Sequence, residues 1–168
     1  MVSEAIANLL RYAAPVAIAA TGETIGQRAG VLNIGLEGTM LSASYVGLLT
    51  DQATGNPWAA LWAGVLTGIV VGLLQAWFTL GMAADSVVVG TAVNLLALGV
   101  TSTAYRFRFG NSGQLLRVPT LPQAGGWDGV MVLSLALAVA GTLLLFRTKW
   151  GLLARASGEY PPAVVASG

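Results

Sequence analysis

The chain has 168 residues, of which 55% are hydrophobic and only 9% are charged, and its formal net charge is +1. Soluble domains contain about 25% charged residues, so this composition indicates a membrane protein. The sequence has no cysteine and no histidine, which argues against a metal site and against hydrolytic catalysis. We therefore expect no catalytic residue, no bound metal and no cofactor, and the balanced charge gives no basic surface for nucleic acid.

Five apolar segments predict five transmembrane helices, because about 20 predominantly apolar residues span a bilayer as a helix. The predicted spans are residues 5–21, 29–50, 58–83, 87–105 and 129–146. The expected fold class is all-α, a polytopic transmembrane helix bundle that forms a single domain over residues 1–168. Polar turns are expected at residues 51–57 and 84–86, with Ser86 as a candidate helix cap.

A polar, glycine-rich break separates the first two spans, from Thr21 to Met40. Its polar and charged residues are Glu23, Gln27, Arg28, Asn33 and Glu37. Membrane proteins retain such breaks at functional positions, where the exposed backbone lines a cavity or packs against other helices.

Three polar side chains at membrane depth are candidates for a substrate path: Asn33, Glu37 and Asn94. A carboxylate in a bilayer costs several kcal/mol unless it is paired, hydrated or neutralised, so Glu37 is expected to face a water-lined interior or Arg28. Asn33 lies four residues before Glu37, and in a helix both would share one face. A structural role is the alternative for each, with Glu37 capping a broken helix and Asn94 bonding across helices.

Small residues recur every fourth position in two places, which predicts close helix packing. The residues are Gly22, Gly26, Gly30, Gly64, Gly68 and Gly72. A second pattern alternates Arg106 and Arg108 with aromatic residues. That alternation can stack nucleic-acid bases, but at the end of a transmembrane helix it favours an interfacial anchor.

Three ordered motifs resemble one family. Residues 23 and 27–40, with the core Asn-Ile-Gly-Leu-Glu-Gly, are followed by residues 87–96 around Asn94 and by residues 148–161. Together they resemble the permeases of ATP-binding-cassette (ABC) importers of the branched-chain amino acid, ribose and nucleoside group. The first motif is most similar to the nucleoside and simple-sugar branch.

The resemblance implies a multi-pass permease subunit of the bacterial inner (cell) membrane that imports a small polar solute, a nucleoside or a simple sugar. Its implied partners are a cytoplasmic ATP-binding-cassette ATPase, which hydrolyses the ATP, an extracytoplasmic solute-binding protein and a second permease subunit. The chain itself would not be an enzyme, and its surroundings would be the lipid bilayer.

Residues 151–168 would be the cytoplasmic coupling segment that docks on the ATPase, through Arg155, Gly158, Glu159 and Pro161. Gly158 and Pro161 can form a turn into a short helix, since proline is tolerated in a first helical turn. Glu159 would then lie near that helix N-terminus. Pro162, which departs from the family pattern, is expected to weaken this helix. From the residues alone, Arg155 and Glu159 are typical of a solvated loop.

A cytoplasmic coupling segment orients the bundle, which a count of lysines and arginines does not. Residues 22–30 and 84–86 would lie inside, with the N-terminus and residues 51–57 and 106–128 outside. Family members are roughly twice as long, with a second related set of helices, so we expect the N-terminal half of a larger permease fold, as a fragment, a truncated product or half of a split permease.

Two other functions remain open from the sequence. An ion- or proton-coupled secondary transporter would use Glu37 as its titrating group. A truncated permease fragment would have no transport activity.

Overall fold

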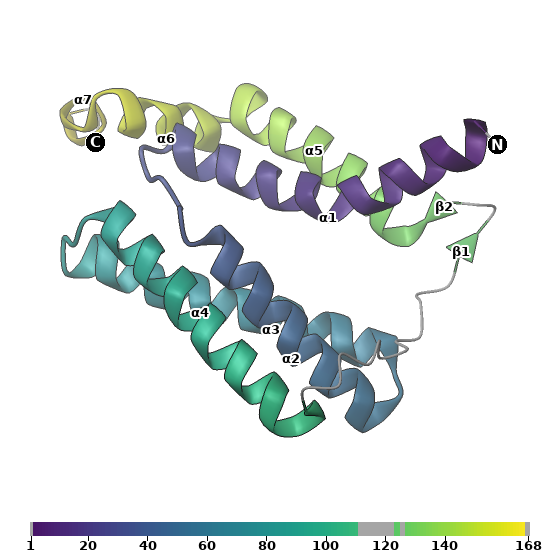
Figure 1. Cartoon of the computed structure of the whole chain (residues 1–168). Helices are drawn as coiled ribbons and strands as arrows, with labels where there is room; N and C mark the ends of the chain where they lie inside the picture. The colour runs from purple at the N-terminus through teal and green to yellow at the C-terminus, as the bar shows by residue number, and fades with distance from the viewer. Residues whose placement is uncertain (1, 111–122, 125–126, 167–168) are drawn as a thin grey trace. The chain divides into compact units, whose positions relative to one another are not determined.

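The computed structural model describes residues 2–110, 123–124 and 127–166 (Figure 1). Its residues divide into two compact units, Met1–Asn33 with Pro122–Gly168, and Ile34–Leu121. Nearly all the described residues are helical, which confirms the predicted all-α class. That both units form one domain stays a prediction.

The first unit consists of α1 (Val2–Arg28), α5 (Gly129–Arg147), α6 (Lys149–Glu159) and α7 (Pro161–Ala166). Before α5, the two-residue strands β1 (Gln123–Ala124) and β2 (Trp127–Asp128) pair in antiparallel orientation. Helix α1 packs along α5, and the two run in the same direction, as the violet and light green ribbons of Figure 1 show.

A sharp turn joins α5 to α6. The Thr148 hydroxyl accepts a 3.0 Å hydrogen bond from the Gly151 N–H and so caps the start of α6. A Cβ at position 151 would overlap the carbonyl oxygens of Leu144 and Leu145. Only glycine fits at this position, so α6 begins directly against the end of α5.

The second unit consists of α2 (Leu36–Thr54), α3 (Pro57–Ala76), the π-helical turn η1 (Trp77–Gly81) and α4 (Ser86–Phe109). Helix α2 packs against both α3 and α4. Gly55 ends α2 with φ +61°, and Asn56 caps α3 by accepting from the Trp58 N–H at 3.0 Å. Glycine with a positive φ commonly ends a helix, and asparagine commonly caps the start of the next one.

The polar break is shorter than predicted. Helix α1 continues to Arg28, and α2 begins only at Leu36, so residues 29–35 alone are non-helical. Asn33 therefore lies outside any helix, and the prediction that it shares a helical face with Glu37 is wrong. The physical reason is Gly30, whose φ of +86° ends the preceding helix.

Other boundaries also differ from those expected. Helix α2 includes residues 51–54, which the sequence predicts as a turn, and the chain turns at Gly55. Asp85, and not Ser86, caps α4, because its carboxylate accepts from the N–H groups of Val87 and Val88. Helix α7 forms in spite of Pro162, since both of its prolines lie in the first turn.

Three of the described helices are long and apolar enough to span a membrane, at Pro57–Gly81, Ser86–Phe109 and Gly129–Arg147. They correspond to the third, fourth and fifth predicted spans. Large apolar side chains project from their surfaces, as at Leu66, Leu96 and Leu135, each at least 60% exposed. Such continuous apolar surfaces are those of lipid-facing or partner-facing helices. Helices α1 and α2 are more polar, with Glu23 and Glu37 among their charged residues.

Candidate functional site

The start of α2 is held by the amide side chain of Asn94, which lies on α4. The Asn94 Oδ1 accepts a 2.7 Å hydrogen bond from the Gly38 N–H, and its Nδ2 donates a 2.9 Å bond to the Ile34 carbonyl oxygen. Gly35, at the N-cap of α2, has no side chain that could make such a bond. A capping side chain normally accepts from the second or third N–H of its own helix. Asn94 supplies that cap from a different helix.

Three glycines let the backbones approach closely around this cap. A Cβ on Gly38 would lie 2.8 Å from the Asn94 Cα, and one on Gly90 would lie 2.7 Å from the Gly35 nitrogen. A Cβ on Gly35 would lie 2.9 Å from the Gln75 side-chain oxygen of α3. The approaches at Gly38 and Gly90 are too short for a larger residue, and Gly35 and Gly38 are both buried.

Sequence reasoning missed Gly35, Gly38 and Gly90 as packing residues. A usable signal was present, because Gly90 lies four residues before Asn94 and therefore on the same face of α4. The glycine stripes that were predicted make fewer contacts. A Cβ on Gly64 would lie 3.4 Å from the Ala43 carbonyl oxygen. A Cβ on Gly22 or on Gly72 would have no neighbouring atom within 4 Å.

The other predicted glycines differ among themselves. A Cβ on Gly68 would lie 4.0 Å from the Thr39 side chain of α2, whereas one on Gly26 would meet only the carbonyl oxygen of Val31, at 3.4 Å. Gly30 lies beyond the end of α1. Residues 22, 26 and 30 therefore do not form one continuous helical stripe.

Glu37 is exposed in the first turn of α2. A carboxylate at this end of a helix is stabilised by the unpaired N–H groups and the macrodipole. Its neighbour Gly38 is buried against α4, so the two residues point to different sides of the helix. This position leaves the carboxylate accessible, and both roles considered for Glu37 stay predictions.

A carboxylate also fixes the segment that follows α1. One oxygen of Glu23 accepts hydrogen bonds from the Asn33 N–H at 3.0 Å and from the Gln27 side chain at 3.1 Å. Because Asn33 is ten residues further along the chain, the first bond closes the irregular segment back onto α1. Glu23 therefore positions the backbone of Asn33.

The end of α6 lies directly against the end of α1. A Cβ on Gly158 would overlap the Arg28 carbonyl oxygen and lie 2.9 Å from the Gly30 nitrogen. A Cβ on Gly30 would in turn lie 3.0 Å from the Gly158 Cα. Glycine at both positions is therefore a condition for this backbone contact.

The four residues predicted for ATPase coupling fall into two groups. Arg155 and Gly158 contact other parts of their own unit, since the Arg155 guanidinium lies 5.0 Å from the ring centre of Phe146 and its Nε donates to the Gly151 carbonyl at 3.3 Å. Glu159 and Pro161 are exposed, on either side of the exposed Tyr160. Glu159 is the last residue of α6, and one residue, Tyr160, separates it from the start of α7.

Arg28 lies over the same ring, with its guanidinium carbon 6.0 Å from the ring centre of Phe146. Cations over an aromatic face gain about 0.5–1 kcal/mol at exposed sites. Phe146 thus joins α5 to the end of α1 and to the middle of α6.

Comparison with known proteins identifies relatives over most of the chain. The model of the family described as "Branched-chain amino acid transport system / permease component" matches residues 5–168. The guanosine ABC transporter permease protein NupQ of Bacillus subtilis is 31% identical, over 95% of this chain and 57% of its own length. The nucleoside ABC transporter permease protein NupC of Lactococcus lactis is 27% identical, over 94% of this chain and 56% of its own length.

A putative glucose ABC transporter permease protein of Haloferax volcanii, TsgC13, is 34% identical, but over only 51% of this chain and 26% of its own length. The chain thus spans about half the length of the nucleoside-permease relatives that it matches. No solved structure matches it.

Proposed function

Since the chain belongs to the family of permease components of branched-chain amino acid transport systems, we propose that it acts as the membrane-spanning permease subunit of an ABC importer. The proposed solute is a nucleoside, with a simple sugar as the second candidate. The two relatives that cover almost the whole chain are named for guanosine and nucleoside transport, whereas the relative named for glucose covers half of it.

The contact of Gly158 with Arg28 and Gly30 is the observation that carries this proposal. A permease of this type hydrolyses nothing itself, so movement of the ATPase must reach the helices through a cytoplasmic segment. Helix α6 and the short helix α7 are that segment here. A backbone contact without intervening side chains transmits displacement, because closely packed atoms do not deform independently.

In the proposed mechanism, movement passes along the chain from this contact to α2. Displacement of α6 moves the end of α1, and the bond between Glu23 and the Asn33 N–H carries that movement along residues 29–33. The next residue, Ile34, leads into the start of α2, which Asn94 holds through two hydrogen bonds. Alternating access would then follow from reorientation of α2 and its neighbours.

The candidates for the substrate path receive different roles in this proposal. Asn94 positions the start of α2, since its acceptor and one donor are both engaged. Asn33 positions the segment before α2 through its backbone. Glu37 is the exposed polar group beside them and is the one of the three that we propose to meet solute or water.

We propose four partners for the complete transporter: a cytoplasmic ATP-binding-cassette ATPase, an extracytoplasmic solute-binding protein, a second permease subunit and the lipid bilayer of a bacterial inner membrane. The exposed residues Glu159, Tyr160 and Pro161 at the junction of α6 and α7 are the proposed contact with the ATPase.

Uptake of radiolabelled guanosine by the native cells tests the proposal, with a strain lacking the gene as reference. Uptake that needs this gene and stops on ATP depletion, but survives collapse of the proton gradient, is expected. Uptake that ignores ATP depletion and stops with the proton gradient would instead favour a proton-coupled transporter. Competition by unlabelled nucleosides and by glucose distinguishes the two solute classes.

Co-purification tests the proposed contact with the ATPase. Glu159→Arg is expected to lose the ATPase, because it reverses the charge at an exposed position of the contact. Gln52→Arg introduces a positive charge at an exposed position near the C-terminal end of α2, away from this junction in the chain. This control variant is expected to retain the ATPase. Equal recovery of the ATPase with both variants would contradict docking at this junction.

A further inference from the structure

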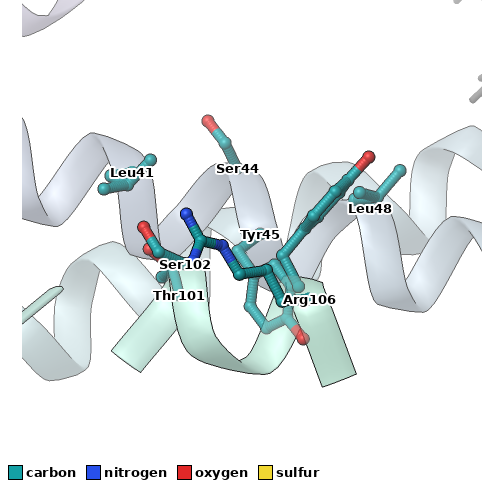
Figure 2. Close-up of a pocket in the computed structure, with 8 residues that line it drawn as sticks. Leu41, Ser44, Tyr45, Leu48, Thr101, Ser102 and Arg106 are labelled. Atoms are coloured by element: carbon teal, nitrogen blue, oxygen red, sulfur yellow. The ribbon is translucent and has the colours of Figure 1, made fainter. Parts of the chain in front are cut away.

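A cavity of about 370 Å³ lies between α2 and α4 in the second unit (Figure 2). Its wall from α2 is formed by Leu41, Ser44, Tyr45 and Leu48, and its wall from α4 by residues 101, 102, 105 and 106. Small-molecule sites have volumes of about 300–1,000 Å³, so this cavity has the size of a site for one small solute. It lies apart from the capping contacts of Asn94, toward the C-terminal end of α4.

The lining of this cavity is rich in polar groups. It combines the Arg106 guanidinium with the hydroxyl groups of Ser44, Tyr45, Ser102 and Tyr105, and none of the described residues that line it is acidic. The Thr101 hydroxyl is occupied, because it donates a 2.6 Å hydrogen bond to the Ala97 carbonyl. Within the described part of the chain, no hydrogen bond engages the side chains of Ser44, Ser102 or Arg106. Their donors are available to a ligand.

Arg106 is positioned to take part in binding. Figure 2 shows its side chain folded back along α4, with the guanidinium directed toward Ser102. The side chain is also exposed, so the interfacial anchor predicted from the sequence stays a prediction. A guanidinium that lines a cavity can present its fork of N–H donors to two neighbouring acceptors on one molecule.

We propose that this cavity is a binding site for a nucleoside whose base presents two adjacent hydrogen-bond acceptors, as the O6 and N7 atoms of guanosine do. Arg106 donates to that acceptor pair, in the bidentate pairing that arginine makes with guanine. Tyr45 and Tyr105, which also line the cavity, supply aromatic surface for the base. Ser44 and Ser102 bond to the hydroxyl groups of the sugar.

This inference rests on the proposed function for its solute class, and it adds a position on the transport route. In the orientation expected from the sequence, the C-terminal end of α4 faces outside. The cavity would then receive solute from the binding protein, before the solute reaches Glu37 at the start of α2.

Equilibrium binding of radiolabelled guanosine to membranes containing the full chain tests the site, with 7-deazaguanosine, which lacks the N7 acceptor, as the competing probe. Wild type is expected to bind guanosine roughly tenfold more tightly than 7-deazaguanosine, because one bond of a bidentate pair is missing. Arg106→Gln is expected to weaken guanosine binding roughly 10- to 100-fold and to bind both compounds equally. Arg108 is exposed and does not line the cavity. Arg108→Gln is therefore the matched control, and it should bind both compounds as wild type does.

The ratio of the two affinities separates recognition by Arg106 from a purely structural role, since a loosened fold would weaken both compounds alike and leave their ratio unchanged. Absence of guanosine binding by wild type, equal binding of both compounds by wild type, or identical behaviour of the two arginine variants would overturn the inference. If Arg106→Gln does not reach the membrane, the ratio of the two affinities in wild type still tests the site. Ser102→Ala is a second test and is expected to weaken the binding of both compounds equally.

Failure of the site and failure of the proposed function give different results. ATP-dependent guanosine uptake that is unchanged in Arg106→Gln would leave the importer in place and remove this cavity from its route. Loss of ATP dependence in wild type would remove the importer itself.

Discussion

The side-chain oxygen of Asn94 accepts a 2.7 Å hydrogen bond from the backbone N–H of Gly38, although the two residues are 56 positions apart in the chain. The same amide donates to the Ile34 carbonyl. One side chain on α4 therefore satisfies a donor at the start of α2 and an acceptor just before it. This arrangement fixes where α2 begins, within the polar motif that identifies the family.

Replacement of Asn94 by alanine should destabilise the chain by about 1–3 kcal/mol, because it leaves the Gly38 N–H and the Ile34 carbonyl without this partner. The thermal unfolding midpoint in detergent measures the effect. Thr91→Ala is the matched control, since the Thr91 hydroxyl on the same helix bonds only to the Val87 carbonyl of its own turn. Equal midpoints for the two variants would contradict the capping role.

Two glycine-to-alanine substitutions should change stability in opposite directions. Gly38→Ala places a Cβ 2.8 Å from the Asn94 Cα, and separating the two backbones costs about 1–3 kcal/mol. Gly72→Ala meets nothing within 4 Å, and alanine favours a helix interior over glycine by about 1 kcal/mol. Unfolding midpoints of both variants under the same conditions test this, and a lowered midpoint for Gly72→Ala alone would reverse the packing assignment.

Loss of the Glu23 carboxylate should release the backbone of Asn33. In Glu23→Ala the Asn33 amide is expected to exchange its hydrogen with solvent roughly 5- to 10-fold faster, because it loses its hydrogen-bond acceptor. Glu23→Gln keeps an oxygen at the accepting position and should exchange nearly as wild type does. Hydrogen exchange measured by mass spectrometry over residues 29–35 gives the result, and equal protection in all three proteins would show that Glu23 does not hold this segment.

Much of the fold could be predicted from composition and helix signals. The third, fourth and fifth predicted spans agree with α3, α4 and α5 to within a few residues at most ends, because long apolar runs bounded by Asn, Asp and Gly have one stable solution in a bilayer. The bounds of the first two predicted spans agree less well with α1 and α2. The glycines and charges of Thr21–Met40 suggested a long break, whereas helical bonds persist through Arg28 and only the positive φ of Gly30 ends them.

The candidate site was only partly predictable, because its geometry depends on contacts between distant residues. The sequence identified Asn94 and Gly158 as special, but not that Asn94 caps another helix or that Gly158 touches Arg28 and Gly30. The assumption of a continuous helix through Asn33 and Glu37 was wrong for the same reason, since local spacing does not reveal a backbone bond to Glu23. The interfacial position expected for Arg106 stays a prediction, but that Arg106 lines a cavity with Ser44 and Ser102 depends on the packing of α2 on α4, which the sequence does not show.

The central claim is that α6 transmits the movement of an ATPase through its contact with the end of α1. The most direct measurement is the number of guanosine molecules taken up per ATP hydrolysed, in proteoliposomes containing the assembled transporter. Gly158→Leu should keep the ATPase bound and hydrolysing while transport per ATP falls close to zero, because the larger side chain separates α6 from Arg28 and Gly30. Gly22→Ala, which meets nothing within 4 Å, should keep the wild-type ratio. A wild-type ratio in Gly158→Leu would contradict the claim.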